Sequence, residues 1–180
     1  MQEEKEFILQ LSDPQTQHKA FERLLQLYQK PLYHHIRNIV LNHDDADDVL
    51  QNTFIKVFNY LKDFKGDSKL FSWMYRIATN EALTFIQQKA KRNGTTSVAL
   101  QSKAIENLTS DAYFDGNEIQ LKLQKAIVRL PEKQLRVFKM KYFEELKYEE
   151  ISEIVGTSVG ALKASYHHAV KKIEEFLKED

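Results

Sequence analysis

The sequence predicts an all-α protein of two small helical domains joined by a flexible linker, and three observations support this fold class. Only 5 Gly and 3 Pro occur among 180 residues, which disfavours a turn-rich all-β fold. Apolar residues recur at helical spacing in most segments. Between residues 93 and 117 this periodicity weakens and Gly, Ser, Thr and Asn become frequent, as in linkers. We therefore expect domains at residues 1–92 and 118–180.

Composition limits the function classes that fit this chain. The absence of Cys excludes disulfides and thiolate metal sites, and it suits a reducing cytoplasm. The charged start, MQEEKEF, is followed by only a short apolar run, so we expect no signal peptide, and no stretch approaches the length of a membrane span. The 26 basic residues balance 26 acidic residues. Because phosphate contacts dominate affinity for DNA, such a neutral chain is expected to bind DNA weakly without a partner.

Apolar residues before residue 41 follow helical spacing in two runs. Asp13 and Pro14 are expected to mark the start of the first run, because proline is favoured at the first position of a helix. Pro31 is expected to interrupt the helix, since proline lacks the backbone donor of an interior position. The apolar spacing then continues to Val40.

The helix expected from about Asp45 to Leu61 is strongly amphipathic. Asp44 is placed to cap its first turn, where the helix dipole favours negative charge. Its inward face carries the apolar residues Leu50, Phe54, Val57, Phe58 and Leu61. Ile55 lies among polar residues on the other face. It is either an isolated surface apolar residue, which is common, or part of a surface that binds a partner.

An aromatic and basic segment follows a turn at residues 64–68, where Asp67 or Ser68 is expected to cap the next helix. Four aromatic residues lie within residues 64–75, close to Arg76 and upstream of three further basic residues. This combination suits single-stranded nucleic acid, because rings stack on bases while cations contact phosphates. The alternative is that most of these rings are buried in the hydrophobic core.

The segment from Leu146 to Lys172 is predicted to form a helix-turn-helix. Gly156 ends the first helix, because glycine tolerates the left-handed backbone found at many helix C-termini. Ser158 is a suitable N-cap for the second helix. That helix has an outer face of polar and basic residues, which suits contact with a DNA major groove. The alternative is an ordinary helical hairpin.

An enzyme hypothesis rests on Asp44, Asp45 and Asp48, which match a DDxxD pattern. In all-helical prenyl-transfer enzymes such a cluster holds magnesium and a diphosphate, because hard cations prefer carboxylate oxygens. Helix capping explains the same residues, and no second acidic motif accompanies them. The adjacent pairs His34–His35 and His167–His168 do not suit chelation, since helical neighbours point about 100° apart. We interpret these histidines as surface or boundary residues and expect no metal site.

Together, three segments resemble the extracytoplasmic-function sigma factors of bacteria, the smallest members of the RNA polymerase sigma-70 superfamily. The first, DDADDVLQNTFIKVFNYLKDF, resembles the region two helix that docks on core polymerase. The second, FKGDSKLFSWMYRIATNEALTFIQQKAKR, resembles the part that melts and reads the minus-ten element. The third, LPEKQLRVFKMKYFEELKYEEISEIVGTSVGALKASYHHAVKKI, resembles region four, which reads the minus-thirty-five element. The likeness extends over nearly the whole chain.

The resemblance implies a sigma factor that is not itself an enzyme and needs no cofactor or small-molecule substrate. Its implied partners are core RNA polymerase, through the clamp helices and flap, and promoter DNA. An anti-sigma factor is a further implied partner and is often membrane-bound in the family. The implied location is the cytoplasm. The rival interpretations are a stand-alone helix-turn-helix regulator and the magnesium-dependent enzyme described above.

Specific residues follow from the resemblance. The docking face against the polymerase would comprise Asp48, Gln51, Asn52, Ile55, Lys56 and Asn59. The minus-ten contacts would comprise Phe64, Arg76, Ile77, Ala78, Asn80, Lys89, Lys91 and Arg92, with Asn80 in a loop over an extruded base. The minus-thirty-five contacts would comprise Ser158, Ala161, Lys163, Ala164, Ser165 and His168. Family members often carry arginine at the positions of Ser165 and His168, so base preference cannot be transferred. Lys147 replaces a usual Ser cap.

Overall fold

The computed structural model describes residues 2–106 and 118–179, and their regular structure is entirely helical. This confirms the all-α fold class. In chain order the elements are α1 (Gln2–Ser12), α2 (Gln17–Val40), α3 (His43–Tyr60), the 3-10 turn η1 (Leu61–Asp63), α4 (Leu70–Arg92), α5 (Ser97–Glu106), α6 (Glu118–Val128), α7 (Glu132–Tyr142), α8 (Tyr148–Val155) and α9 (Val159–Glu179). Within the described ranges, no helix is long and apolar enough to cross a membrane.

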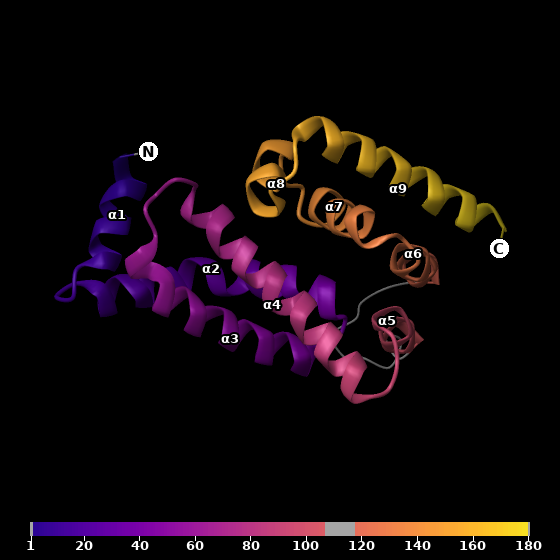
Figure 1. Cartoon of the computed structure of the whole chain (residues 1–180), viewed down its shortest axis with the longest axis horizontal. Helices are drawn as coiled ribbons and strands as arrows, with labels where there is room; N and C mark the ends of the chain where they lie inside the picture. The colour runs from indigo at the N-terminus through magenta and orange to yellow at the C-terminus, as the bar shows by residue number, and fades with distance from the viewer. Residues whose placement is uncertain (1, 107–117, 180) are drawn as a thin grey trace.

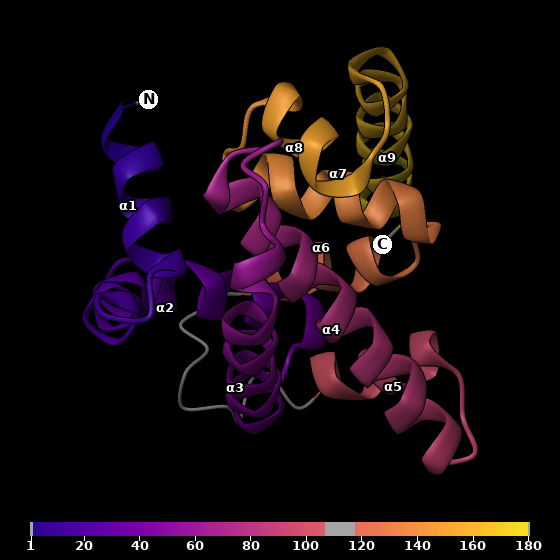
Figure 2. The ribbon, with the colours of Figure 1, turned by 60° about the vertical axis from the view of Figure 1, so that its left-hand side comes forward.

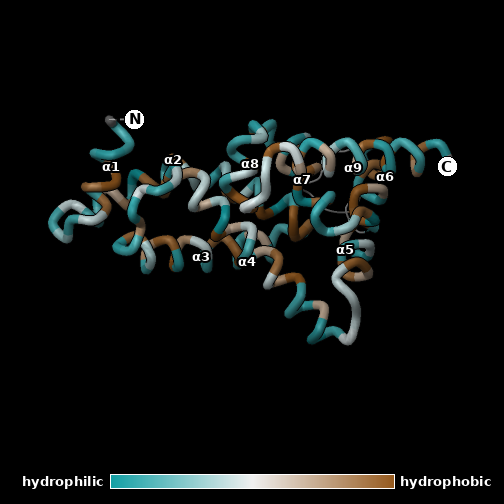
Figure 3. The backbone as a smooth tube through the Cα atoms, turned by 45° about the horizontal axis from the view of Figure 1, so that its top comes forward, coloured by the Kyte–Doolittle hydropathy of each residue, from teal (hydrophilic) through white to brown (hydrophobic). Residues whose placement is uncertain are grey.

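The helices form two groups (Figure 1). In the N-terminal bundle, α2, α3 and α4 pack against one another, and α1 packs on α2. In the C-terminal bundle, α6, α7 and α8 pack on the long helix α9. Hydrophobic and hydrophilic stretches alternate along the helical turns (Figure 3), as expected for amphipathic helices that bury one face.

The two bundles share a hydrophobic core, which the sequence did not predict. The main cluster of buried residues combines Leu32, Ile36 and Met74 of the N-terminal bundle with Met140 and Ile151 of the C-terminal bundle. Helix α8 lies against α4 (Figure 2), and α7 also contacts α2. A smaller cluster, centred on Ile127 and Ile173, fills the C-terminal bundle alone. Burial across the boundary therefore holds one bundle on the other.

Helix α5 lies within the predicted linker and packs between the bundles. It covers residues 97–106 of that segment, while residues 107–117 lie outside the described part. The side chain of Gln101 donates a hydrogen bond from Nε2 to the carbonyl of Ile39 at 2.9 Å. Ile105 is buried beside Leu41 and Val128, so this helix contacts residues from both bundles.

Two expectations about the start and course of α2 are wrong. The helix begins at Gln17 rather than at Pro14, because Asp13 forms a local turn in which its Oδ1 accepts a hydrogen bond from the Gln15 backbone at 2.9 Å. Pro31 does not interrupt α2. It is exposed, so water can solvate the carbonyl that loses its donor, while Leu24 and Leu32 of the same helix remain buried.

The caps of α3 and α4 also differ from expectation. Asn42, not Asp44, caps α3, with its Oδ1 accepting a hydrogen bond from the Asp45 backbone at 2.9 Å. Neither Asp67 nor Ser68 caps α4. Instead, Oε1 of Glu4 in α1 accepts a hydrogen bond from the Leu70 backbone at 2.9 Å. A carboxylate from the first helix thus stabilises the N-terminus of α4, where the helix dipole favours negative charge.

The helix-turn-helix is confirmed in α8 and α9. Gly156 adopts the left-handed conformation, with φ of 68°, and its backbone donates to the carbonyl of Ser152. The hydroxyl of Ser158 lies 3.4 Å from the backbone nitrogen of Ala161, in the first turn of α9. At the start of α8, the Glu150 carboxylate accepts a hydrogen bond from the Lys147 backbone at 2.9 Å, which compensates for the missing Ser cap.

Candidate functional site

The outer face of α3 presents the six predicted docking residues to solvent, and all six are exposed. Ile55 is 59% exposed, a large fraction for an apolar side chain. The opposite face of the helix is buried through Leu50, Phe54 and Val57. The structure therefore confirms the division of this helix into an inner and an outer face.

An apolar groove of about 530 Å³ runs beside this outer face, between α2 and α3. Gln51, Ile55 and Asn59 line it from α3. Phe21 and Leu25 line it from α2, and sequence reasoning did not include them in the site. The sequence contained a signal for them, because both lie on the apolar side of α2 together with Leu24. Leu24 is buried in the bundle, whereas Phe21 and Leu25 are only partly buried and leave apolar surface accessible. Exposed apolar surface of this kind is typical of a protein-binding site.

One residue of the acidic cluster of α3, Asp45, forms an ion pair with α4. Both carboxylate oxygens of Asp45 accept hydrogen bonds from Lys89 Nζ, at 2.7 and 2.6 Å. Asp44 and Asp48 are exposed. Across residues 2–106 and 118–179, no group of three or more His, Asp or Glu residues is arranged to hold a metal ion. The carboxylate set of the magnesium hypothesis is therefore not assembled here, and Lys89 is partly neutralised.

The predicted minus-ten residues fall mainly on one long helix. Asn80 lies within α4 rather than in a loop, because the apolar spacing continues without a break through Ala82 and Ile86. Its side chain is exposed, whereas Ala78 is fully buried and faces the core. Phe64 packs on Trp73, with ring centroids 4.8 Å apart, and Ile77 is half-buried.

The basic residues of α4 differ in whether they are only exposed to solvent or also contact another helix. Lys91 and Arg92 are exposed in the last turn. Arg76 is exposed too, but its guanidinium donates a hydrogen bond to the backbone carbonyl of Glu153 in α8. Lys69, just before α4, lies 3.8 Å from Glu150 of α8. Helix α8 therefore occupies part of the face on which the DNA contacts were predicted.

The predicted minus-thirty-five residues lie in the N-terminal half of α9 and, for Ser158, directly before it. Ser158, Ala161, Lys163, Ala164 and His168 are all exposed. Ser165 is half-buried and lines a cavity of about 320 Å³ with Lys133 and Arg136 of α7. The Lys163 ammonium lies 5.7 Å from the centroid of the Tyr148 ring, so a cation–π contact holds this side chain near α8.

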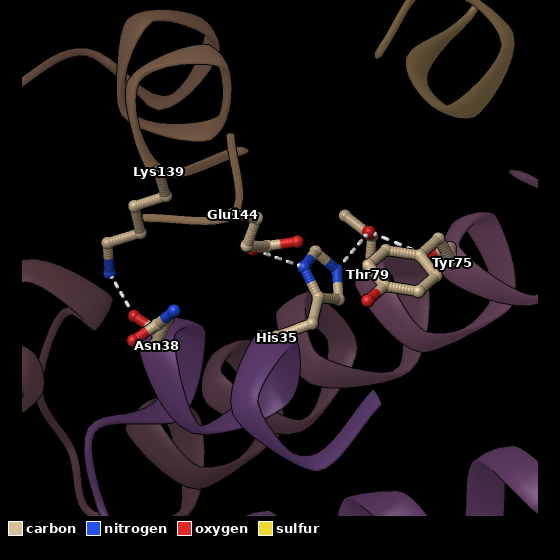
Figure 4. Close-up of polar contacts among 6 residues, drawn as sticks. All are labelled: His35, Asn38, Tyr75, Thr79, Lys139 and Glu144. Carbon is tan, nitrogen blue, oxygen red and sulfur yellow. Dashed lines mark hydrogen bonds and ion pairs between the residues drawn. The ribbon is translucent and has the colours of Figure 1, made fainter. Parts of the chain in front are cut away.

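A polar cluster is buried where the two bundles meet (Figure 4). His35 of α2 is only 1% exposed, so its interpretation as a surface or boundary residue is wrong. Its Nδ1 lies 2.7 Å from Glu144 Oε1 and its Nε2 lies 2.8 Å from Thr79 Oγ1. Lys139 of α7 is buried and donates from Nζ to the carbonyl of Asn38. Sequence offered no signal for these contacts.

Burial dominates the electrostatics of this cluster. It lowers the pKa of Lys139 to about 7, and the nearby Glu144 carboxylate offsets part of that effect. Burial also raises the pKa of Tyr75, whose ring lies 4.7 Å from that of His35, and the charge of Glu144 adds to the rise. Holding the charged form of Lys139 at the boundary between the bundles therefore costs energy.

Comparison with known families matches both bundles to one protein family. Residues 24–92 match Sigma-70 region 2, and residues 120–173 match Sigma-70, region 4. Together the two matches cover more than half of the chain. The first includes α3 and α4, and the second includes the helix-turn-helix.

Curated proteins of similar sequence belong to the same family. The ECF RNA polymerase sigma factor SigW of Bacillus subtilis is 28% identical over 89% of this chain and 90% of that protein. The RNA polymerase sigma-H factor of Pseudomonas aeruginosa is also 28% identical, over 88% of this chain and 86% of that protein. The chain belongs to the extracytoplasmic-function sigma factors of the sigma-70 family.

Solved structures share the fold. CnrH, solved in complex with the cytosolic domain of CnrY, superimposes with a TM-score of 0.71 and 18% identity, covering 98% of both chains. The sigma factor RpoE, solved in complex with the anti-sigma factor NepR from Bartonella quintana, gives a TM-score of 0.65 and 21% identity, covering 90% of this chain and 99% of that one. The whole two-bundle architecture is thus similar to those two chains.

Proposed function

We propose that this protein is a sigma factor that binds core RNA polymerase, directs it to specific promoters and helps to open the DNA. The observation that carries the proposal is the order of two sigma-70 regions on one chain, each with an exposed candidate binding face. A stand-alone regulator would need only the helix-turn-helix. The exposed face of α3, with its apolar groove, is in addition typical of a surface that binds a protein partner.

Each surface has a proposed role. The outer face of α3, together with the groove wall formed by α2, binds core polymerase. Exposed polar and basic residues of α4 contact the minus-ten element, and residues between Ser158 and His168, at the start of α9, contact the minus-thirty-five element. We assign residues 1–92 to the first two roles and residues 118–180 to the third, with the intervening segment as the linker.

An anti-sigma factor is a second proposed protein partner. The chains that share this fold were solved with CnrY and with the anti-sigma factor NepR, which supports such a partner here. We propose a cytoplasmic location, because the proposed binding partners are promoter DNA and core polymerase. A membrane-bound anti-sigma factor would hold it at the inner membrane.

Transcription with purified components tests the proposed function. Core polymerase, the chain and a genomic promoter library are combined, and the transcripts are sequenced. We expect defined start sites only when both proteins are present. Because the chain carries no net charge, duplex binding by the free chain should be weak and salt-sensitive. Tight, sequence-specific binding without core polymerase, and no new transcripts with it, would identify a stand-alone regulator instead.

A further inference from the structure

The ring of Tyr148, the first residue of α8, lies close to two lysine side chains that come from different helices. The Lys163 ammonium, from α9, lies 5.7 Å from the ring centroid, and the Lys141 ammonium, from α7, lies 5.3 Å from it. Ammonium groups at such distances are attracted by the negative face of an aromatic ring. One half-buried ring therefore links a cation of the recognition helix to the helices packed beside it.

The Tyr148 ring is supported by the aromatic core of the C-terminal bundle. It meets the ring of Tyr166 edge to face, with ring centroids 6.4 Å apart. Tyr166 in turn stacks on Phe138, with centroids 5.7 Å apart, and Phe138 is buried. Edge-to-face and stacked arrangements of this kind are favourable for aromatic pairs. Because these contacts fix the ring, the ring fixes the position of an ammonium held against it.

The two lysines differ in what else they contact. Lys141 Nζ donates a hydrogen bond to the carbonyl of Leu146 at 3.1 Å, which ties it to the segment between α7 and α8. Lys163 is exposed, and among the described residues its ammonium forms no ion pair with a carboxylate. The Glu150 carboxylate, in the first turn of α8, accepts a hydrogen bond from the Lys147 backbone instead. Lys163 therefore keeps an uncompensated charge for an anionic ligand.

The contact with Tyr148 turns Lys163 toward the first helix of the helix-turn-helix. In proteins of this type the second helix reads base edges in the major groove, whereas the first helix crosses the DNA backbone. Tyr148 lies in the first turn of α8, which is that first helix. An ammonium held against it lies on the side where phosphates of bound DNA would pass. A contact to phosphate contributes affinity but carries no sequence information directly.

We propose that Tyr148 is a positioning residue that holds Lys163 for a backbone phosphate of the minus-thirty-five element rather than for a base edge. This inference rests on the proposed function, because it gives a role to one residue of the surface assigned there. Lys163 then adds affinity at every promoter, while other exposed residues of the same helix, such as His168, read the sequence. The ring orders the lysine before DNA binds, which reduces the entropy lost in the complex.

A measurement on the free chain tests the positioning without DNA. Aromatic rings shift the NMR resonances of protons above their faces upfield, so the methylene next to the Lys163 ammonium should show this shift. Tyr148→Leu should remove the shift, and Tyr148→Phe, which keeps the ring, should retain it. Lys178 is the reference, because it is exposed near the end of the same helix. An unshifted Lys163 in the parent chain would overturn the proposal, whatever the function of the protein.

A second measurement uses the full chain bound to core polymerase. Affinity is measured for one promoter and for each single base-pair variant of its minus-thirty-five element. Lys163→Ala should weaken binding to all of them by the same factor and reduce the slope of log affinity against log salt by about 0.9. Tyr148→Leu should weaken binding about two- to fivefold, as for one exposed cation–π contact, and Tyr148→Phe should match the parent chain. Lys178→Ala removes the same charge and should change neither affinity nor slope.

The double variant distinguishes positioning from a purely structural role. Tyr148→Leu added to Lys163→Ala should cause no further loss, because the lysine that the ring orders is already absent. A further loss of the same size would overturn the proposal, since Tyr148 would then act only through the fold. A Lys163→Ala loss confined to one base pair would overturn it too, because that pattern identifies a base contact.

Two further points keep the outcomes separate. If Tyr148→Leu does not fold, the resonance of Lys163 in the parent chain and the uniform loss in Lys163→Ala still decide the question. Failure of the proposed function has a different signature, which is the absence of promoter-specific transcripts when the parent chain is added to core polymerase.

Discussion

Helices α3 and α4 lie side by side in the N-terminal bundle, but their candidate binding faces differ in accessibility. All six docking residues of α3 are exposed, and an apolar groove lies beside them. On α4, Arg76 contacts α8, Lys89 is paired with Asp45 and Ala78 is buried. The proposed polymerase-binding face is therefore accessible, whereas α8 and neighbouring side chains occupy part of the proposed DNA-contacting face. The accessibility of a predicted site residue thus depends on which helix packs beside it.

The largest expected effect tests the accessible face. Ile55→Glu places a charge in the apolar groove and should weaken binding to core polymerase by roughly a hundredfold, as for a central interface residue. The measurement is affinity for core polymerase, with circular dichroism to monitor folding. Leu27→Glu is the matched control, because Leu27 is 53% exposed on α2 and does not line the groove. Equal losses in both variants would contradict the assigned face.

Solution pH should change the free energy of unfolding through the buried Lys139. In the folded chain the pKa of Lys139 is lowered from 10.5 to about 7, so folding releases a proton and stability rises as pH increases from 7 toward 10. The folding equilibrium constant should change by at most about tenfold per pH unit. Glu144, His35 and Tyr75 are the other titratable groups of the cluster. Chemical unfolding of the parent chain and of Lys139→Met across this pH range isolates the lysine, and identical profiles would refute its role.

A smaller effect is expected on the DNA face of α4. Asn80→Ala removes an exposed amide that can both donate to and accept from a base edge, so selectivity at the minus-ten element should fall about tenfold. Affinity of the closed promoter complex should remain nearly unchanged. Lys163→Ala, on the recognition helix, should instead weaken that closed complex. Permanganate footprinting with closed-complex affinity separates the two steps, and equal effects on one step would contradict this division.

The smallest effect concerns the ion pair between α3 and α4. Asp45→Asn removes the counter-charge of Lys89, whose side chain is 32% exposed, and frees the ammonium for phosphate. Single-strand affinity should rise a few-fold at low salt, and the slope of log affinity against log salt should steepen by about 0.7. Asp44→Asn, in the same turn, is the control and should change neither value. A salt titration with fluorescence anisotropy gives both.

Local patterns predicted most of the helices but few of the contacts between them. The faces of α3 and the turn at Gly156 followed from spacing and backbone preference, which depend on neighbours in sequence. The interruption predicted at Pro31 was wrong, because a helix can continue through a proline whose surroundings are solvated. The residue type alone does not show whether the position is solvated. The surface or boundary position predicted for His35 was wrong for a different reason. Its partner Glu144 is 109 positions away, and spacing carries no information about such pairs.

The candidate site shows the same limit. Sequence placed the exposed residues of α3 and α9 correctly, because a polar stripe on an amphipathic helix marks the solvent side. It did not show that Arg76 contacts α8, that Ala78 faces the core, or that Phe21 and Leu25 complete a groove. These features depend on how helices cross one another. Apolar spacing identifies a buried face but does not specify its neighbour.

The cap that Glu4 provides to α4 has a practical consequence for anyone who alters the start of the chain. This bond joins residues 66 positions apart, and it fixes the first turn of the helix that carries the proposed minus-ten contacts. An affinity tag or fusion partner that displaces α1 would loosen that turn while leaving every proposed DNA-contacting side chain unaltered. Promoter opening measured with such a fusion would then report the tag as well as the protein. Placing the tag after α9 avoids this confusion.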